Sequence, residues 1–187
     1  MKYAIVLDGA VQGYREYNEQ PLCKIIDGLA TLRPVSDIPV SGQFNPAYFS
    51  EHTTVEVFDD EVVCTHTLVP VELEIAKQIK LKQLFDEKNT ASQENVTVHG
   101  RQWSATFEDQ SLLTQAILMV QNGLPLPAVW RDATKQPMNI TDVSELIAIA
   151  TEIAINVEQA FTHYWELETQ LESDTTSTVE QIIQIVW

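Results

Sequence analysis

The stretch that decides the fold of this chain is TDVSELIAIATEIAINVEQAFTHYWELETQL, residues 141–171. Its apolar side chains recur every three or four residues, which places them on one face of a single α-helix. The members of this apolar stripe are Val143, Leu146, Ile147, Ala150, Ile153, Ala154, Val157, Ala160, Phe161, Tyr164, Leu167 and Leu171. A helix of about thirty residues is roughly 45 Å long, which favours a domain that lays it along other helices or other copies of itself. The chain is therefore expected to hold proteins together rather than to do chemistry.

The same region has an unusual charge pattern. Residues 136–187 contain no Lys or Arg but nine Asp or Glu. The glutamates of the long helix lie mostly off the apolar stripe, so one interpretation is that they keep its outer face hydrated. The alternative is an acidic surface that meets a basic partner. Lys77, Lys80 and Lys82 would offer a basic surface of that kind, in the same chain or in a neighbouring copy.

The composition excludes several classes of partner. The formal net charge is −16 over 187 residues. Such a surface repels phosphate backbones and anionic lipid, so we expect neither nucleic acid nor membrane among the partners. No apolar run reaches the length of about eighteen residues that a membrane-spanning helix needs. Residues 1–8 are too short, and too soon interrupted by Asp8, to predict a signal peptide.

The first part of the chain is predicted to be β-rich. Residues 2–7 form an apolar strand, Asp8-Gly9 indicates a turn, and residues 11–17 return as its partner. Prolines and glycines punctuate residues 21–50, which predicts short loops or extended pieces there. A second hairpin is predicted from residues 53–58 and 62–69, which flank a polar turn at residues 59–61.

A connector is predicted to follow. Pro70 ends the strand, and residues 71–87 have the spacing of a helix. Residues 89–95 are polar and lack periodicity, so we predict a linker and a domain boundary there.

The third part combines short hairpins with helices. A tight hairpin is predicted around His99-Gly100, and a helix at residues 110–121 has Asp109 as its cap and Gly123 at its end. Residues 128–132 and 138–140 are predicted to pair as strands. Capping boxes are predicted at Asp142 with Glu145, before the long helix, and at Ser177 with Glu180, before a last short helix. The prediction is an α+β fold with a β-rich N-terminal module at residues 1–70, a connector helix and linker at 71–95, and a C-terminal module of short hairpins plus a long amphipathic helix at 96–187.

Residues 96–187 resemble a small domain family of unassigned function found in bacteriophage tail-associated proteins and prophage genes. The family has a V-x-G-x-x-W/F hairpin, a helix rich in Ser and Gln, a strand pair, a long Ala- and Ile-rich helix with an aromatic pair, and a short helix ending in Trp. The matching residues here are Val98, Gly100, Trp103, Gln110, Ser111, Trp130, Ile140, Thr141, Ala148, Ala150, Ala154, Tyr164, Trp165, Ile182 and Trp187.

The front half resembles the N-terminal modules of tail-fibre accessory proteins. The similarity lies in residues 54–58, 62–63 and 68–71, followed by a helix that carries lysines. Together the resemblances imply a virion structural protein of the tail or baseplate region, which attaches or supports tail fibres. They imply no catalytic residue and no cofactor. The implied partners are other phage tail or fibre proteins in a homo- or hetero-oligomer, located in the virion tail or in the host cytoplasm during assembly.

Four aromatic residues are the predicted interaction residues beside the three lysines. Tyr164 and Phe161 belong to the apolar stripe, whereas Trp165 lies at its border, where a partner could cover it. A duller interpretation is that the strand pair with Trp130 covers Trp165 within the domain. Trp187 would either pack back on its own domain, which the resemblance favours, or insert into a neighbour.

Two other classes of function remain open. One is a transient chaperone for tail-fibre assembly. The other is a small hydrolase or metal-dependent enzyme, because Cys64 and His66 are two residues apart in a strand and share a face. A metal would need two more ligands, and no second close pair exists. A structural role is favoured for Cys64 and His66. Asp59-Asp60-Glu61 is predicted to be a hydrated turn rather than a cation site. Cys23 and Cys64 are predicted to be buried free thiols.

Overall fold

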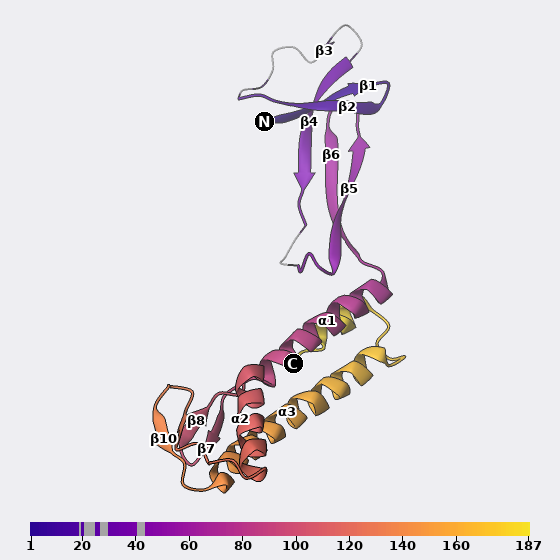
Figure 1. The fold of residues 1–187 in the computed structure, drawn as a ribbon. Coiled ribbons are helices and arrows are strands. Elements are labelled where there is room, and N and C mark those ends of the chain that lie inside the picture. The colour runs from indigo at the N-terminus through magenta and orange to yellow at the C-terminus, as the bar shows by residue number, and fades with distance from the viewer. Residues whose placement is uncertain (19, 21–24, 27–29, 41–43) are drawn as a thin grey trace. The chain divides into compact units, whose positions relative to one another are not determined.

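The structure, a computed structural model, describes residues 1–18, 20, 25–26, 30–40 and 44–187. The chain divides into two compact units, Met1–Glu72 and Leu73–Trp187. Strands build the first unit, and helices with two short hairpins build the second (Figure 1). The α+β class predicted from the sequence is confirmed. No helix among the described residues has the length and apolar character needed to cross a membrane.

The first unit is one sheet. Among the described residues its strands are β1 (Lys2–Leu7), β2 (Ala10–Glu16), β3 (Ile25–Ile26), β4 (Ala30–Ile38), β5 (Phe49–Val57) and β6 (Val62–Pro70). They pair in the order β2-β1-β4-β6-β5, and β3 pairs with β4 (Figure 1). All pairings are antiparallel except that of β4 with β6. A small core of Ala4, Val6, Val62 and Cys64 lies on one face of this sheet.

The two predicted hairpins are present. β1 and β2 meet at Asp8-Gly9, where both residues have positive φ, 51° and 77°. That backbone is the one a tight two-residue hairpin needs, and glycine adopts it without strain. β5 and β6 pair over their full lengths, from Phe49 opposite Pro70 to Val57 opposite Val62.

The prediction for residues 21–50, short loops or extended pieces, allowed for a strand but did not place one, and residues 30–38 form β4. Pro34 is one of the prolines on which that prediction rested. It lies between the part of β4 that pairs with β3 and the part that pairs with β6, so the strand accommodates a residue without an N–H to donate. The neighbours of β4 are distant in sequence, and no local pattern reveals them. Pro21, Cys23, Gly28 and Gly42 lie outside the described residues.

The second unit is organised around α3 (Val143–Glu172), the helix predicted from residues 141–171. α1 (Leu73–Ala91) packs along α3 and also contacts α4 (Val179–Gln184). The predicted boundary at residues 89–95 therefore differs from the observed one between Glu72 and Leu73. The buried residues of α1 are Ala76, Leu84 and two lysines, Lys80 and Lys88, whose stems fill space between the helices.

The short hairpins of this unit agree with prediction. β7 (Val96–Val98) pairs with β8 (Arg101–Trp103) across His99-Gly100, whose φ values are 53° and 74°. β9 (Val129–Arg131) pairs with β10 (Pro137–Asn139). Together with α2 (Phe107–Gln121) they close a core around Trp103, Leu113, Leu146 and Ile149 at the first half of α3.

Helix caps are the main local differences. Thr106, not Asp109, caps α2, and its hydroxyl accepts from the backbone N–H of Asp109. Asp142 caps α3 as predicted, but Glu145 accepts from Thr141 rather than completing a box with Asp142. The capping box of α4 is Thr178 with Gln181, one residue after the predicted pair. Each difference arises because neighbouring hydroxyl and carboxylate side chains compete for the same first-turn N–H groups.

Candidate functional site

The apolar stripe of α3 is largely buried within its own unit. The buried residues of this helix are Leu146, Ile149, Ile153, Ala160, Tyr164, Leu167 and Leu171. They face α1, α2 and the β7–β8 hairpin. Of the two arrangements expected for the stripe, the structure shows packing along other helices of the same unit. Packing along other copies stays a prediction. What remains available is the border of the stripe.

That border forms an apolar groove of about 450 Å³ between α2 and α3. α3 contributes its floor at spacings of three and four residues: Ala150, Ile153, Ala154, Val157, Phe161 and Trp165. Leu113 lines it from α2, and Gln110, Thr114 and Glu158 supply the polar edge. We call this feature the α2–α3 groove. Its lining is of the kind that buries an apolar side-chain face, with few polar groups to orient a small molecule.

Phe161 and Trp165 lie one turn apart at one end of the groove. Their ring centroids are 5.8 Å apart with planes at 62°, an edge-to-face arrangement. The side chain of Trp165 is 56% exposed, which is unusual for the largest apolar residue. Both residues were predicted from sequence as interaction residues, Trp165 at the border of the stripe and Phe161 within it, and the structure places both in the groove lining.

Trp130 does not cover Trp165, so the interpretation that the strand pair covers this residue within the domain is wrong. Trp130 instead packs against the core cluster formed by β7, β8, α2 and the first half of α3. Because Trp165 lies in the second half of α3, that cluster leaves its indole exposed.

Tyr164 is a core residue rather than a contact residue. It is buried, its ring meets that of Phe85 edge-to-face at 6.3 Å, and its hydroxyl donates to Glu168 at 3.0 Å. Burial raises the pKa of Tyr164, and the nearby Glu168 carboxylate raises it further. Its role is to fix α1 against α3.

Trp187 packs back on its own unit. Its ring meets His163 of α3 edge-to-face, with centroids 4.8 Å apart. It also lines a shallow hollow with Asp86, Glu87 and Thr90 of α1. Its side chain is 38% exposed, so one face remains on the surface.

The three predicted lysines do not form one basic surface. Lys80 is buried, and its amine donates to the carbonyl of Ile183 in α4 at 3.5 Å. Burial lowers the pKa of Lys80, while Glu87 opposes that shift. Lys77 is half-buried and Lys82 is exposed. A basic partner for the acidic helices is therefore not supplied by α1.

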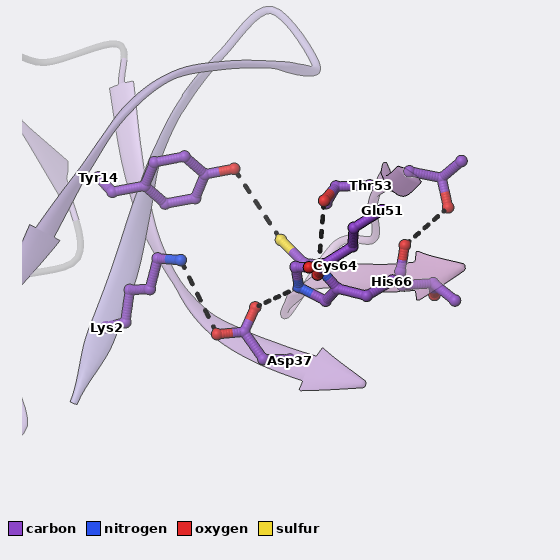
Figure 2. Close-up of polar contacts among 9 residues, drawn as sticks. Lys2, Tyr14, Asp37, Glu51, Thr53, Cys64 and His66 are labelled. Carbon is purple, nitrogen blue, oxygen red and sulfur yellow. Dashed lines mark hydrogen bonds and ion pairs between the residues drawn. The ribbon is translucent and has the colours of Figure 1, made fainter. Parts of the chain in front are cut away.

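Cys64 and His66 share one face of β6 but do not contact each other as nucleophile and base. The Cys64 thiol is buried and lies 3.9 Å from the Tyr14 hydroxyl (Figure 2). Partial burial, with Cys64 and Asp37 nearby, raises the pKa of Tyr14. Since a catalytic thiol needs a base within hydrogen-bond reach, this geometry favours a packing role for Cys64.

The ring nitrogens of His66 face carboxylates on opposite sides. Nδ1 is 2.5 Å from Glu51 and 3.1 Å from the Thr53 hydroxyl, and Nε2 is 3.8 Å from Asp37 (Figure 2). Lys2 pairs with the same Asp37 at 3.8 Å. Carboxylates on opposite sides of a ring cannot share one metal with it. This polar cluster joins β1, β4, β5 and β6 across the sheet.

No group of three or more His, Cys, Asp or Glu in the described ranges is arranged to hold a metal ion. In the turn at residues 59–61, Asp59 and Asp60 are exposed and Glu61 accepts from the Ser36 hydroxyl at 2.8 Å. Glu61 thus ties the turn to β4.

Comparison with known protein families identifies the second unit. The family described as "Domain of unknown function (DUF4376)" matches residues 75–184, more than half of the chain. The chain belongs to this family. No curated protein and no solved structure matches. The DUF4376 match begins inside α1, so this helix belongs to the domain rather than to a connector.

Sequence reasoning missed Lys88 of the DUF4376 domain. This lysine is buried, and its amine lies over the rings of Phe85, Phe161 and Tyr164, at 3.9, 4.2 and 5.5 Å from their centroids. Phe161 thus joins the groove to this cluster. Lys88 and Phe85 are three residues apart on α1, so the sequence could have predicted their contact. The contacts of Lys88 with Phe161 and Tyr164 could not be predicted, because they depend on how α1 packs against α3.

Two carboxylates of the DUF4376 domain, the buried Asp132 and the half-buried Asp109, hold local backbone and side-chain groups in place. Asp132 accepts from the Thr134 hydroxyl at 2.7 Å and from the backbone of Thr134 and Gln136. The Thr134 hydroxyl, followed by these backbone groups and Arg101, holds the pKa of Asp132 below its usual value. Burial opposes ionisation of Asp109, but hydrogen bonds from Ser104 and Thr106 outweigh it and lower that pKa. Local structure explains both carboxylates, so neither indicates a ligand site.

Proposed function

We propose that this protein is a non-enzymatic virion structural protein of a bacteriophage tail or baseplate, where it attaches or supports tail fibres through protein–protein contacts. The observation that carries the proposal is the α2–α3 groove, with Trp165 left 56% exposed at its end. The resemblance of residues 96–187 to domains of phage tail-associated proteins supplies the class of assembly. The protein would then be located in the tail of the virion.

The lining of the groove supports binding rather than chemistry. It contains one carboxylate, Glu158, and no Cys, His or Lys. Covering a few hundred Å² of apolar surface contributes several kcal/mol, at about 25 cal/mol per Å², before the entropy lost on association. Such contacts are strong enough when several copies of a fibre attach together.

The test uses tailed particles of the phage or prophage that encodes the chain. We expect the wild-type protein in purified particles at a fixed ratio to other tail proteins, measured by quantitative mass spectrometry. Ala154→Arg places a long charged side chain in the groove at an exposed position, so it should remove the protein from particles without unfolding it. Gln159→Arg, exposed on another face of the same helix, is the matched control and should be retained.

One result would overturn the virion function, and another would overturn attachment through the groove. If the wild-type chain binds fibre proteins before assembly but is absent from purified particles, it is an assembly chaperone of the host cytoplasm. If Ala154→Arg is retained as well as Gln159→Arg, with both folded by circular dichroism, the groove is not the point of attachment.

A further inference from the structure

The helices that form the groove have a one-sided charge. α2 and α3 together contain eight Asp or Glu and no Lys or Arg. Several of these carboxylates are engaged locally: Asp109 by Ser104 and Thr106, Glu145 by Thr141, and Glu168 by Tyr164. Glu158 lines the groove and has no ion pair with a basic side chain in the described part of the chain. Glu158 is therefore the acidic edge of an otherwise uncharged groove, and no basic side chain in the described part of the chain forms an ion pair with it.

The shape of the groove suits a helix. Its floor runs from Ala150 to Trp165 on one face of α3, a distance of about 22 Å at 1.5 Å per residue. Its walls are helices, whose backbone groups are already hydrogen-bonded within each helix. An extended segment laid there would leave its own N–H and C=O groups unpaired, whereas an α-helix brings them already satisfied.

Charge argues against a second copy of this chain as the occupant. A copy would bring a net charge of −16 and the same acidic helices. Its lysine-bearing helix is a poor match, because Lys80 and Lys88 are buried while Glu74, Asp86 and Glu87 are exposed. Like charges facing each other across the groove would be unfavourable.

We infer that the occupant of the α2–α3 groove is an amphipathic α-helix of a partner protein, with Lys or Arg along the flank that meets Glu158. This inference rests on the proposed docking function and adds the chemistry of the partner. The apolar face of that helix covers Val157, Phe161 and Trp165, and its basic flank neutralises the acidic edge. The partner is therefore a helix-presenting protein rather than an extended peptide.

The test measures binding of two fluorescein-labelled synthetic helices of about eighteen residues, long enough to span the floor. Both carry the same Leu and Ala face; one has Lys on its flanks and the other has Glu. By fluorescence anisotropy with the full-length protein, we expect the Lys peptide to bind about tenfold or more tightly than the Glu peptide, with affinity falling as salt rises. Ala154→Arg should abolish binding of both.

A matched pair of charge reversals locates the effect. Glu158→Lys should weaken binding of the Lys peptide several-fold, whereas Glu152→Lys should change it little. The two variants have the same net charge, but residue 152 lies about 120° away around α3 and does not line the groove. Circular dichroism checks that both variants keep their helix content.

The outcomes separate this inference from the proposed function. Equal binding of the two peptides, or equal effects of Glu158→Lys and Glu152→Lys, overturns the basic flank while leaving attachment through the groove in place. No binding of either peptide, when Ala154→Arg still removes the protein from particles, overturns the helical occupant alone. Retention of Ala154→Arg in particles overturns attachment through the groove, on which this inference rests, whatever the peptides do.

Discussion

Lys88 has the least ordinary environment of any lysine in the DUF4376 domain. It lies on α1, yet its amine is surrounded by the rings of Phe85, Phe161 and Tyr164, the last two of which belong to α3. A desolvated ammonium over aromatic faces is stabilised by the negative quadrupoles of the rings. Its aliphatic stem fills space between the helices at the same time. One residue thus fixes both the spacing and the register of α1 against α3.

Lys88→Met tests this role because it keeps the stem and removes the charge. We expect it to lower the free energy of unfolding by about 1–2 kcal/mol, the size of a buried cation–π interaction. Denaturant unfolding followed by tryptophan fluorescence measures the change. Lys82→Met, at an exposed position of the same helix, is the control and should stay within about 0.5 kcal/mol of wild type. Unchanged or increased stability of Lys88→Met would show that the rings do not stabilise the amine.

Residue spacing predicted side-chain direction well but packing partners poorly. Tyr164 and Trp165 are adjacent, and the 3.6-residue period separates them into the buried and exposed positions that the structure shows. The groove beside Trp165 could not be predicted, because it depends on α2 covering only the first half of α3. The burial of Lys80 and Lys88 was missed for the same reason. The helical period shows which side chains share a face, but it does not show which element covers that face.

At the scale of elements, the β1–β2 hairpin contains two glycines, Gly9 and Gly13, that can be compared by substitution with Ala. Gly9 has φ of +77°, whereas Gly13 does not have a positive φ, and a Cβ added at either would meet no atom within 4 Å. Substitution by Ala therefore isolates backbone conformation from steric contact. The left-handed region costs a residue with a Cβ about 1–2 kcal/mol.

We expect Gly9→Ala to destabilise the first unit by about 1 kcal/mol and Gly13→Ala to be neutral or slightly stabilising. Thermal unfolding followed by circular dichroism in the strand region measures both. If the two variants shift the midpoint by the same amount, the dihedral argument for this turn is incorrect.

Elements fixed by local signals were predicted, and elements fixed by distant partners were not. The turns at Asp8-Gly9 and His99-Gly100 need only their own residues, and both are in place. β4 needs β1 on one side and β6 on the other, and the parallel pairing of Val35 with Val62 joins residues separated by an entire strand. The prolines and glycines of this region left both loops and extended pieces open, and the sheet places Pro34 where a missing N–H is tolerated.

At the scale of the whole molecule, the division at residues 72–73 can be tested by truncation. The fragment 73–187 contains all of α1 and the entire DUF4376 match, so we expect it to unfold cooperatively with helix content close to that of the same region in the full chain. The fragment 96–187 begins at the boundary predicted from sequence and lacks α1. It should lose its cooperative transition, because Tyr164 and the face of α4 near Ile183 would lose their cover.

Circular dichroism melts of the two fragments distinguish the boundaries. Equal cooperativity of 96–187 and 73–187 would mean that α1 is a connector after all. The physical reason for the expected difference is that a long helix exposing its apolar stripe on one side has too little buried area to remain ordered.

The absence of Lys and Arg from α3 and α4 also determines how the protein can be detected. Trypsin cuts after basic residues, and Lys135 is the last one before Trp187. Digestion therefore leaves residues 136–187 on a single large peptide that routine peptide mapping records poorly. A glutamate-directed protease cuts this region at Glu145, Glu152 and Glu158, so the particle experiment should use it to monitor the very segment that carries the groove.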